Sequence, residues 1–175
     1  VAPAEDNRSE VRLVLQDGAE GLRVSGAARF TGAQARSNYE VAQDPAEWEA
    51  RVERFFTGIL PGFRLIDAPW EIRDAAPPSL RLEVDGLVEA DGAGAIAVLG
   101  GLRFQPRLAA LAQRTEDLLL RYPFEEHILL QTDTPALSFA GPPAASGEGP
   151  GCRWSLTTSP GRIELDVSLG RGRIL

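Results

Sequence analysis

The sequence lacks lysine and methionine, and it contains one cysteine, Cys152, and one histidine, His127. A lone cysteine cannot form an internal disulfide or a cysteine-rich zinc site. Without lysine, no glycine-rich segment can complete a phosphate-binding P-loop. Few routes to enzyme chemistry remain, so the sequence predicts no catalytic residue, no metal site and no cofactor.

Long hydrophobic runs are also missing. No apolar stretch approaches the roughly 20 residues that cross a bilayer, and the amino end is polar, with Glu5 and Asp6 close to its start. We therefore predict no membrane insertion and no signal peptide. Because the chain starts at Val1 and contains no methionine, we expect it to be an excised piece of a larger protein.

Positive charge is scarce relative to negative charge. All 18 basic residues are arginines, and 25 acidic residues bring the net charge to -7. A negative protein repels phosphate backbones, so nucleic acid is not an expected partner. With 43% hydrophobic residues in 175, the chain can bury the core of one ordinary domain. We expect residues 1–10 to form a flexible segment and residues 11–175 to form a single domain.

Several short segments alternate apolar and polar residues, which is typical of strands with one buried face. Residues 11–16 and 22–24 predict two strands joined by a glycine turn. The clearest pattern is a hairpin over 152–157 and 162–169, in which Cys152 shares the apolar face with Trp154. A lone hairpin is marginally stable in water, so it needs partner strands. The other predicted strands are 80–85, 95–99, 128–132 and 137–139.

One amphipathic helix is predicted over residues 44–60. Asp44 is a good N-cap, Pro45 suits the first helical position, and Glu47 stands three residues after the cap. Pro61 and Gly62 end the pattern. An apolar stripe at helical spacing predicts docking against a core. The members of this stripe are Trp48, Val52, Phe55, Phe56 and Ile59.

Shorter helices are predicted over 32–39 and 107–113, and the segment 141–151, rich in proline and glycine, is predicted to be a long loop. Together these elements predict a mainly β fold. We expect a mainly antiparallel β-sandwich, with the helix at 44–60 covering a sheet edge or one open end.

The two reactive residues favour structural roles. Cys152 lies on the apolar face of its strand, where cysteine behaves as a small hydrophobic residue, whereas a reactive thiolate needs an electropositive, partly exposed site. His127 projects from the face opposite Ile128. A Cys–His pair would require both side chains on one side of adjacent strands, which nothing in the sequence demands. No ligand spacing supports a metal site built from His127 and carboxylates.

Two further groups of residues were weighed for function. The acid pair Glu125 and Glu126 points to opposite sides of a strand, and we expect both carboxylates to be solvated. With Trp48 and Trp154 assigned to the core, three aromatic residues remain for a ligand or partner surface. These residues are Trp70, Tyr39 and Tyr122.

The order of several short motifs resembles a known family. The motifs are Gly32-Ala33-Gln34-Ala35-Arg36, Leu60-Pro61-Gly62-Phe63, the segment from Asp74 to Leu80, Arg121-Tyr122-Pro123-Phe124, and the proline- and glycine-rich loop before the terminal hairpin. From about Val11 onward the chain resembles the uncharacterised β domain that follows the transglutaminase-like (papain-fold) domain of certain bacterial envelope proteins.

The resemblance implies a β-sandwich of jelly-roll type in the bacterial periplasm or cell envelope. In such proteins the catalytic Cys, His and Asp belong to the preceding domain, and nothing in this chain matches their motif. The expected function is therefore that of a non-catalytic accessory module, which supports or positions a transglutaminase-like domain of the same parent chain, or its substrate. A stand-alone module that binds carbohydrate or peptide is the alternative, and a small hydrolase is the least favoured reading.

Overall fold

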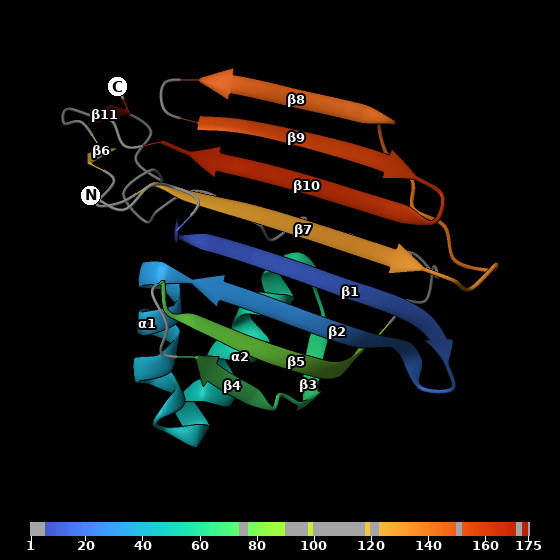
Figure 1. Cartoon of the computed structure of the whole chain (residues 1–175). Helices are drawn as coiled ribbons and strands as arrows, with labels where there is room; N and C mark the ends of the chain where they lie inside the picture. Colours follow the sequence, from blue (N-terminus) through green and yellow to red (C-terminus); the bar gives the residue numbers. More distant parts are fainter. Residues whose placement is uncertain are drawn as a thin grey trace.

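The computed structural model describes residues 6–73, 77–89, 98–99, 118–119, 123–149, 152–170 and 173–174. More than half of these residues lie in strands, and nine strands form one mixed sheet (Figure 1). The predicted helix at 107–113, most of the predicted strand at 95–99 and Tyr122 lie outside the described residues.

The large sheet has the strand order β3-β5-β2-β1-β7-β10-β9-β8, and β4 also pairs with β5. The β1–β7 pair is parallel and the other pairs are antiparallel. The strands are β1 (Arg8–Gly18), β2 (Gly21–Thr31), β3 (Phe63–Asp67), β4 (Trp70–Arg73), β5 (Ser79–Val88), β7 (Phe124–Thr132), β8 (Ala144–Gly149), β9 (Cys152–Ser159) and β10 (Arg162–Leu169). A separate ladder joins β6 (Leu118–Leu119) and β11 (Arg173–Ile174).

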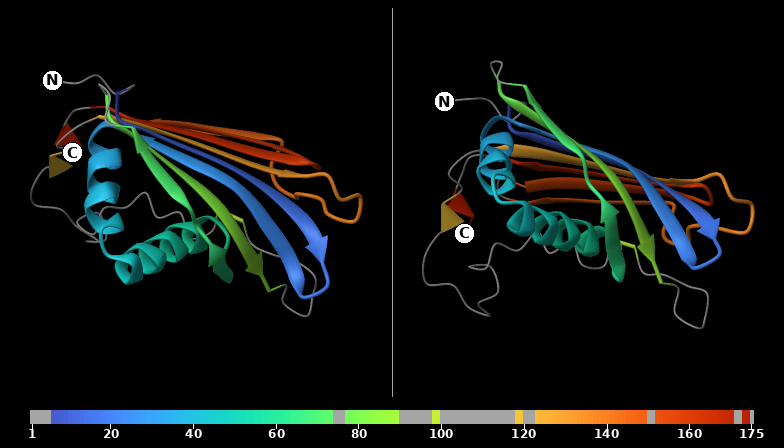
Figure 2. Two further views of the ribbon diagram at one scale, coloured as in Figure 1. Left: turned by 60° about the horizontal axis from the view of Figure 1, so that its bottom comes forward. Right: turned by 90° about the horizontal axis from the view of Figure 1, so that it is seen from below.

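The predicted mainly β fold is confirmed, and in the described part of the chain helices cover its large sheet. Helices α1 (Gly32–Ala42) and α2 (Pro45–Ile59) lie against one face of the curved sheet (Figure 2). In the described part of the chain they stand where a sandwich or jelly roll would place a second large sheet. The parallel β1–β7 pair is the exception within a sheet whose other pairs are antiparallel.

The face that meets the helices is the apolar face, and register explains its continuity. Val11 pairs with Ala28 on one side and with Ile128 on the other, and Ile128 pairs with Leu165. These residues form one apolar row across the sheet. The residues two positions away on each strand form the next apolar row, because side chains alternate between the faces of a sheet. From α2, Trp48, Val52, Phe56 and Ile59 bury their side chains in the same core.

Both helices begin at side-chain caps. The Asp44 carboxylate accepts hydrogen bonds from the amides of Ala46 (3.0 Å) and Glu47 (3.3 Å), as the sequence predicts. The helix α1 extends three residues beyond the predicted 32–39. Its neighbour Thr31 provides no side-chain cap. Instead the Asn7 side chain accepts a hydrogen bond of 2.9 Å from the amide of Ala33, so a residue distant in sequence fixes this helix start.

Replacing Asp44 with alanine is expected to lower the free energy of unfolding by about 1 kcal/mol, because two amide donors lose their acceptor. Chemical denaturation monitored by circular dichroism measures this change. Asp44→Asn retains a capping oxygen and serves as the matched control, with a loss of a few tenths of a kcal/mol at most. Equal losses in both variants would contradict the capping role.

Three sequence predictions are wrong in detail. Residues 137–139 form no strand, since Leu137 and Phe139 bond to a turn and to the Pro160 carbonyl instead of to a ladder. The predicted loop 141–151 contains β8, which pairs with β9 because tertiary pairing overrides the weak strand preference of glycine and alanine. Strand β1 begins at Arg8, inside the segment expected to be flexible, because that part of the chain pairs with both β2 and β7.

Candidate functional site on the polar face of the sheet

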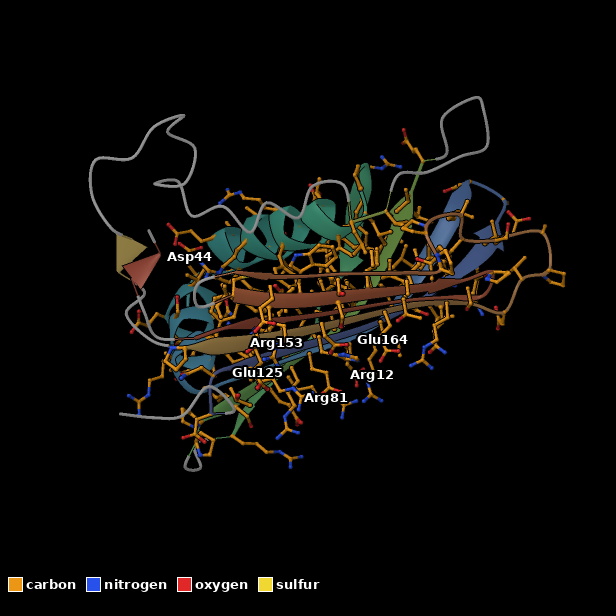
Figure 3. The ribbon with its side chains drawn as sticks, turned by 90° about the horizontal axis from the view of Figure 1, so that it is seen from above. Arg12, Asp44, Arg81, Glu125, Arg153 and Glu164 are labelled. Carbon is orange, nitrogen blue, oxygen red and sulfur yellow. The ribbon has the colours of Figure 1, made fainter. Side chains whose placement is uncertain are left out.

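The sheet face opposite the helices is the polar face, and most of its strands contribute charged side chains to it. Figure 3 shows Arg12, Arg81, Glu125, Arg153 and Glu164 on the side away from the helices, whereas Asp44 lies on the helix side. Arginines and carboxylates from different strands alternate across this face. It is therefore the surface most suited to contact with a charged partner.

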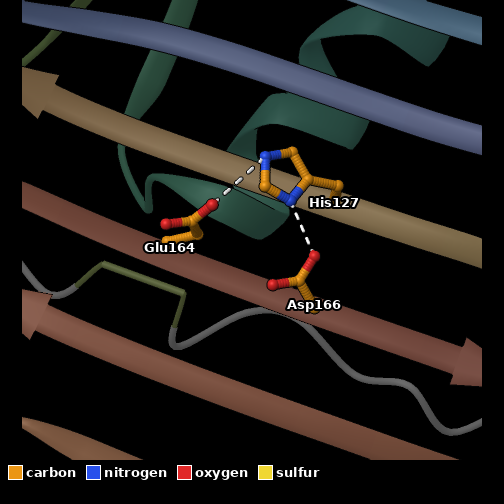
Figure 4. Close-up of side chains that lie close together, drawn as sticks. All are labelled: His127, Glu164 and Asp166. Atoms are coloured by element: carbon orange, nitrogen blue, oxygen red, sulfur yellow. Dashed lines mark hydrogen bonds and ion pairs between the residues drawn. The ribbon is translucent and has the colours of Figure 1, made fainter.

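His127 lies near the centre of this face with both ring nitrogens directed at carboxylates (Figure 4). The Asp166 carboxylate lies 2.7 Å from Nδ1, within hydrogen-bonding distance, and the Glu164 carboxylate lies 3.7 Å from Nε2. The pairing of β7 with β10 sets Asp166 directly opposite His127 and places Glu164 two residues away on the same face. The imidazole side chain is only 14% exposed.

Arginines neutralise part of this cluster. Arg162 lies 2.8 Å from Glu164, and Arg12 lies 2.6 Å from Glu10, the residue opposite His127 on β1. Partial burial acts to raise the pKa of the Glu10 carboxyl, but the hydrogen bond from Arg12 and the positive charges of Arg12 and Arg8 outweigh it. The pKa of Glu10 is consequently lowered, and this carboxylate stays charged at neutral pH.

The donor set of His127, Glu164 and Asp166 has the chemistry of a metal site, with one ligand atom from each residue within 4.8 Å of the others. The geometry does not fit one ion, because the two carboxylates approach opposite ring nitrogens and a metal binds only one of them. Glu164 is also paired with Arg162. We therefore assign these side chains to an ionic network rather than to a preformed metal centre.

The polar face is hollowed to a volume of about 210 Å³ at the network, and His127 and Asp166 belong to the lining. Ser155 and Ser168 are small, and the longer side chains of Arg8, Glu125 and Arg153 line the same hollow. A serine triad requires the histidine between the serine and the acid. Here Asp166 lies between Ser155 and His127 in the cross-strand row, so His127 is not placed to take a proton from Ser155.

The structure separates the two residues that the sequence singled out. Cys152 pairs with Leu169 on the apolar face, whereas His127 pairs with Asp166 on the polar face. The strand β10 also lies between their strands. A Cys–His catalytic pair is therefore not formed.

The expected aromatic surface is brought together only in part. Trp70 and Tyr39 meet with ring centroids 6.0 Å apart, and Trp70 also contacts Trp48 at 6.0 Å. Trp70 is half-buried at the rim of the core, and Tyr39 is 39% exposed. The assignment of Trp154 to the core is wrong, because this side chain is on the apolar face but 37% exposed near the β8 edge.

Glu126 is the titratable residue whose environment the sequence did not reveal. The pairing with Ser9 and Val167 places its carboxyl on the apolar face rather than in solvent. Burial raises the pKa of Glu126 to about 7. The hydroxyl of Ser9 is buried and has no hydrogen-bond partner in the described residues. The one available signal was strand parity, because Glu126 alternates in phase with the apolar Ile128 and Leu130.

No family model, curated protein or solved structure matches the chain. Among the described residues, no helix has the length and apolar character that a membrane span requires.

Proposed function

We propose that the chain is a non-catalytic accessory β module that uses the polar face of its sheet to support or position a neighbouring domain of a larger protein, or the substrate of that domain. The neighbour that the sequence resemblance suggests is a transglutaminase-like domain. In this proposal the reactive residues belong to the neighbour, and the module supplies a binding surface.

The main support is the polar face itself. Interfaces of this kind use interleaved charges to fix orientation, because opposite charges attract at matched positions and like charges repel at wrong ones. On this face arginines approach carboxylates at several positions, including Arg12 with Glu10 and Arg23 with Asp85. Two further observations support a non-catalytic role. Cys152 and His127 lie apart, and Asp166 rather than His127 lies next to Ser155.

The first test is genetic and biochemical. We expect the reading frame that encodes the chain to encode a transglutaminase-like domain as well, and we expect the two domains, expressed separately, to bind each other. Isothermal titration would detect the complex. A reading frame without such a domain, or separate domains that do not associate, would overturn the proposal.

A matched pair of variants locates the contact. Arg153→Glu reverses a charge at the rim of the hollow on the polar face, and it is expected to weaken the complex by at least about tenfold. Arg54→Glu makes the same charge change on the exposed side of α2, and it is expected to leave affinity within about twofold because that side lies off the polar face. Equal weakening by both variants would indicate a general effect of charge and not a contact at this face.

A stand-alone ligand-binding module is the second candidate, and the contact between Tyr39 and Trp70 favours it. Aromatic side chains near the surface can stack on sugar rings or peptide groups. Titration with oligosaccharides should then change tryptophan fluorescence, and Tyr39→Ala should abolish the change. Constant fluorescence throughout the titration would remove the support for this candidate.

A further inference from the structure

A second hollow on the polar face has a composition different from that of the His127 region. It has a volume of about 120 Å³ and lies over β2, β4 and β5. Three of its five lining residues are arginines, one is a serine and one is a glutamate. They are Arg29, Arg73, Arg81, Ser79 and Glu71.

Strand register brings the three guanidinium groups together. Arg29 on β2 is the direct cross-strand partner of Arg81 on β5. Arg73 on β4 pairs with Ser79, which precedes Arg81 by two residues and shares its face. Like charges directly opposite each other on a sheet are destabilising. In a chain with net charge -7, this concentration of positive charge stands out from the composition as a whole.

Arg29 is the least neutralised of the three. Among the described residues it has no ion pair and no side-chain hydrogen bond. Its cross-strand neighbour on the other side is Glu10, but the Glu10 carboxylate accepts hydrogen bonds from Arg12, with Nη2 at 2.6 Å. The carboxylate that could have neutralised Arg29 is thereby turned toward another arginine.

The partners of the other two arginines are exposed and weak. Arg81 approaches Glu83 at 3.2 Å, and Arg73 approaches Glu71 at 3.5 Å. All four of these side chains are more than half exposed, and such pairs contribute little to stability. Both arginines can therefore exchange a carboxylate of the chain for an external anion at small cost.

We propose that Arg29, Arg73, Arg81 and Ser79 form a binding site for one small oxyanion, a carboxylate or a phosphate group. The guanidinium fork donates paired hydrogen bonds to either group, and the serine hydroxyl supplies a further donor. The volume of about 120 Å³ is enough for a single such group. The site adds to the proposed function a chemical group that the polar face binds. Its biological use rests on the proposed function, whereas anion binding itself does not.

The test titrates the isolated chain with inorganic phosphate and, separately, with acetate, at constant ionic strength with chloride as the balancing anion. Nuclear magnetic resonance follows the backbone amides of Arg29, Ser79 and Arg81, which are expected to shift and saturate. Saturation with phosphate alone assigns the site to phosphate groups, and saturation with acetate alone assigns it to carboxylates. No saturable shift with either anion would overturn the site.

Two variants separate the site from the overall charge. Arg29→Gln is expected to weaken anion binding by roughly tenfold, the loss of one charge-assisted hydrogen-bonding group. Arg162→Gln makes the same change in net charge on the same face but outside the hollow, and it is expected to alter affinity by less than about twofold. Equal weakening by the two variants would show that anions respond only to net charge.

A melting-temperature measurement gives an independent readout. Without added anion, Arg29→Gln is expected to melt at a higher temperature than the parent chain because the like-charge pair with Arg81 is removed. Addition of the binding anion should then raise the melting temperature of the parent chain more than that of the variant, which binds the anion more weakly. Equal rises in both would contradict the site. These measurements need no partner domain. Absence of anion binding would therefore leave the proposed function standing, and absence of a partner domain would leave the anion site standing.

Discussion

Replacing Trp48 with alanine is expected to lower the free energy of unfolding by about 3 to 5 kcal/mol, the cost of removing a large aromatic side chain from a core. Trp48 is 5% exposed and contacts the Trp70 ring with centroids 6.0 Å apart. Its loss would leave a cavity between α2 and the edge of the sheet that rigid neighbours cannot fill. Denaturation in urea, followed by circular dichroism, measures the change.

Two companion variants sharpen this prediction. Trp48→Phe keeps a ring in the core and removes the indole Nε1 donor, which is buried and has no acceptor in the described residues. Its expected loss is below about 1.5 kcal/mol, because removal of an unsatisfied polar group offsets part of the lost packing. Arg54→Ala, on the exposed side of the same helix, is expected to change stability by less than about 0.5 kcal/mol. An unchanged denaturation curve for Trp48→Ala would contradict the docking of α2.

Replacing Glu126 with glutamine is expected to stabilise the protein at pH 8 by up to about 3 kcal/mol and to have little effect at pH 4. Burial raises the pKa of Glu126 from 4.5 to about 7 in the folded chain. The folded state therefore holds this proton more tightly than the unfolded state does. The contribution of protonated Glu126 to the free energy of unfolding is fully present below about pH 4.5 and is lost as pH rises through about 7. Its size is about 1.4 kcal/mol for each unit of difference between the folded and unfolded pKa values.

The measurement is a pair of denaturation series, at pH 4 and pH 8, for the parent chain and for two variants. Glu125→Gln is the matched control, since this neighbouring acid lies on the polar face. It is expected to change the free energy of unfolding only slightly at pH 4 and at pH 8. If Glu126→Gln shifts stability equally at pH 4 and pH 8, the carboxyl is not titrating in the apolar environment that the structure shows.

Local patterns in the sequence predicted much of the fold. The hairpin of β9 and β10 was predicted from alternation alone, because a period of two assigns each side chain to a face without knowledge of the partner strand. The helix α2 was predicted from its cap, its first-turn proline and its stripe, which are all local. The strands β3 and β4 were missed, since they are short and their pairing with β5 is not visible in their own residues.

The candidate site was less accessible to prediction. Strand alternation predicts that His127 lies on the face opposite Ile128, and the structure agrees. Its partners Glu164 and Asp166 are more than 30 residues away, and only the β7–β10 pairing brings them to the imidazole. The hollow lined by Arg29, Arg73 and Arg81 forms only because β2, β4 and β5 pair in one register. In the sequence each of these residues looks like an ordinary surface arginine.

The sequence by itself determined which side of β1, β5, β9 and β10 is apolar, where α2 begins and ends, and that Cys152 lies on an apolar face. These properties depend on residues close together along the chain. The tertiary structure alone decided that β1 runs parallel to β7, that two helices form the second layer, and that desolvation raises the pKa of Glu126. These outcomes depend on which distant segments pair and in what register. Pairing is chosen by the packing of the whole core, which no local pattern encodes.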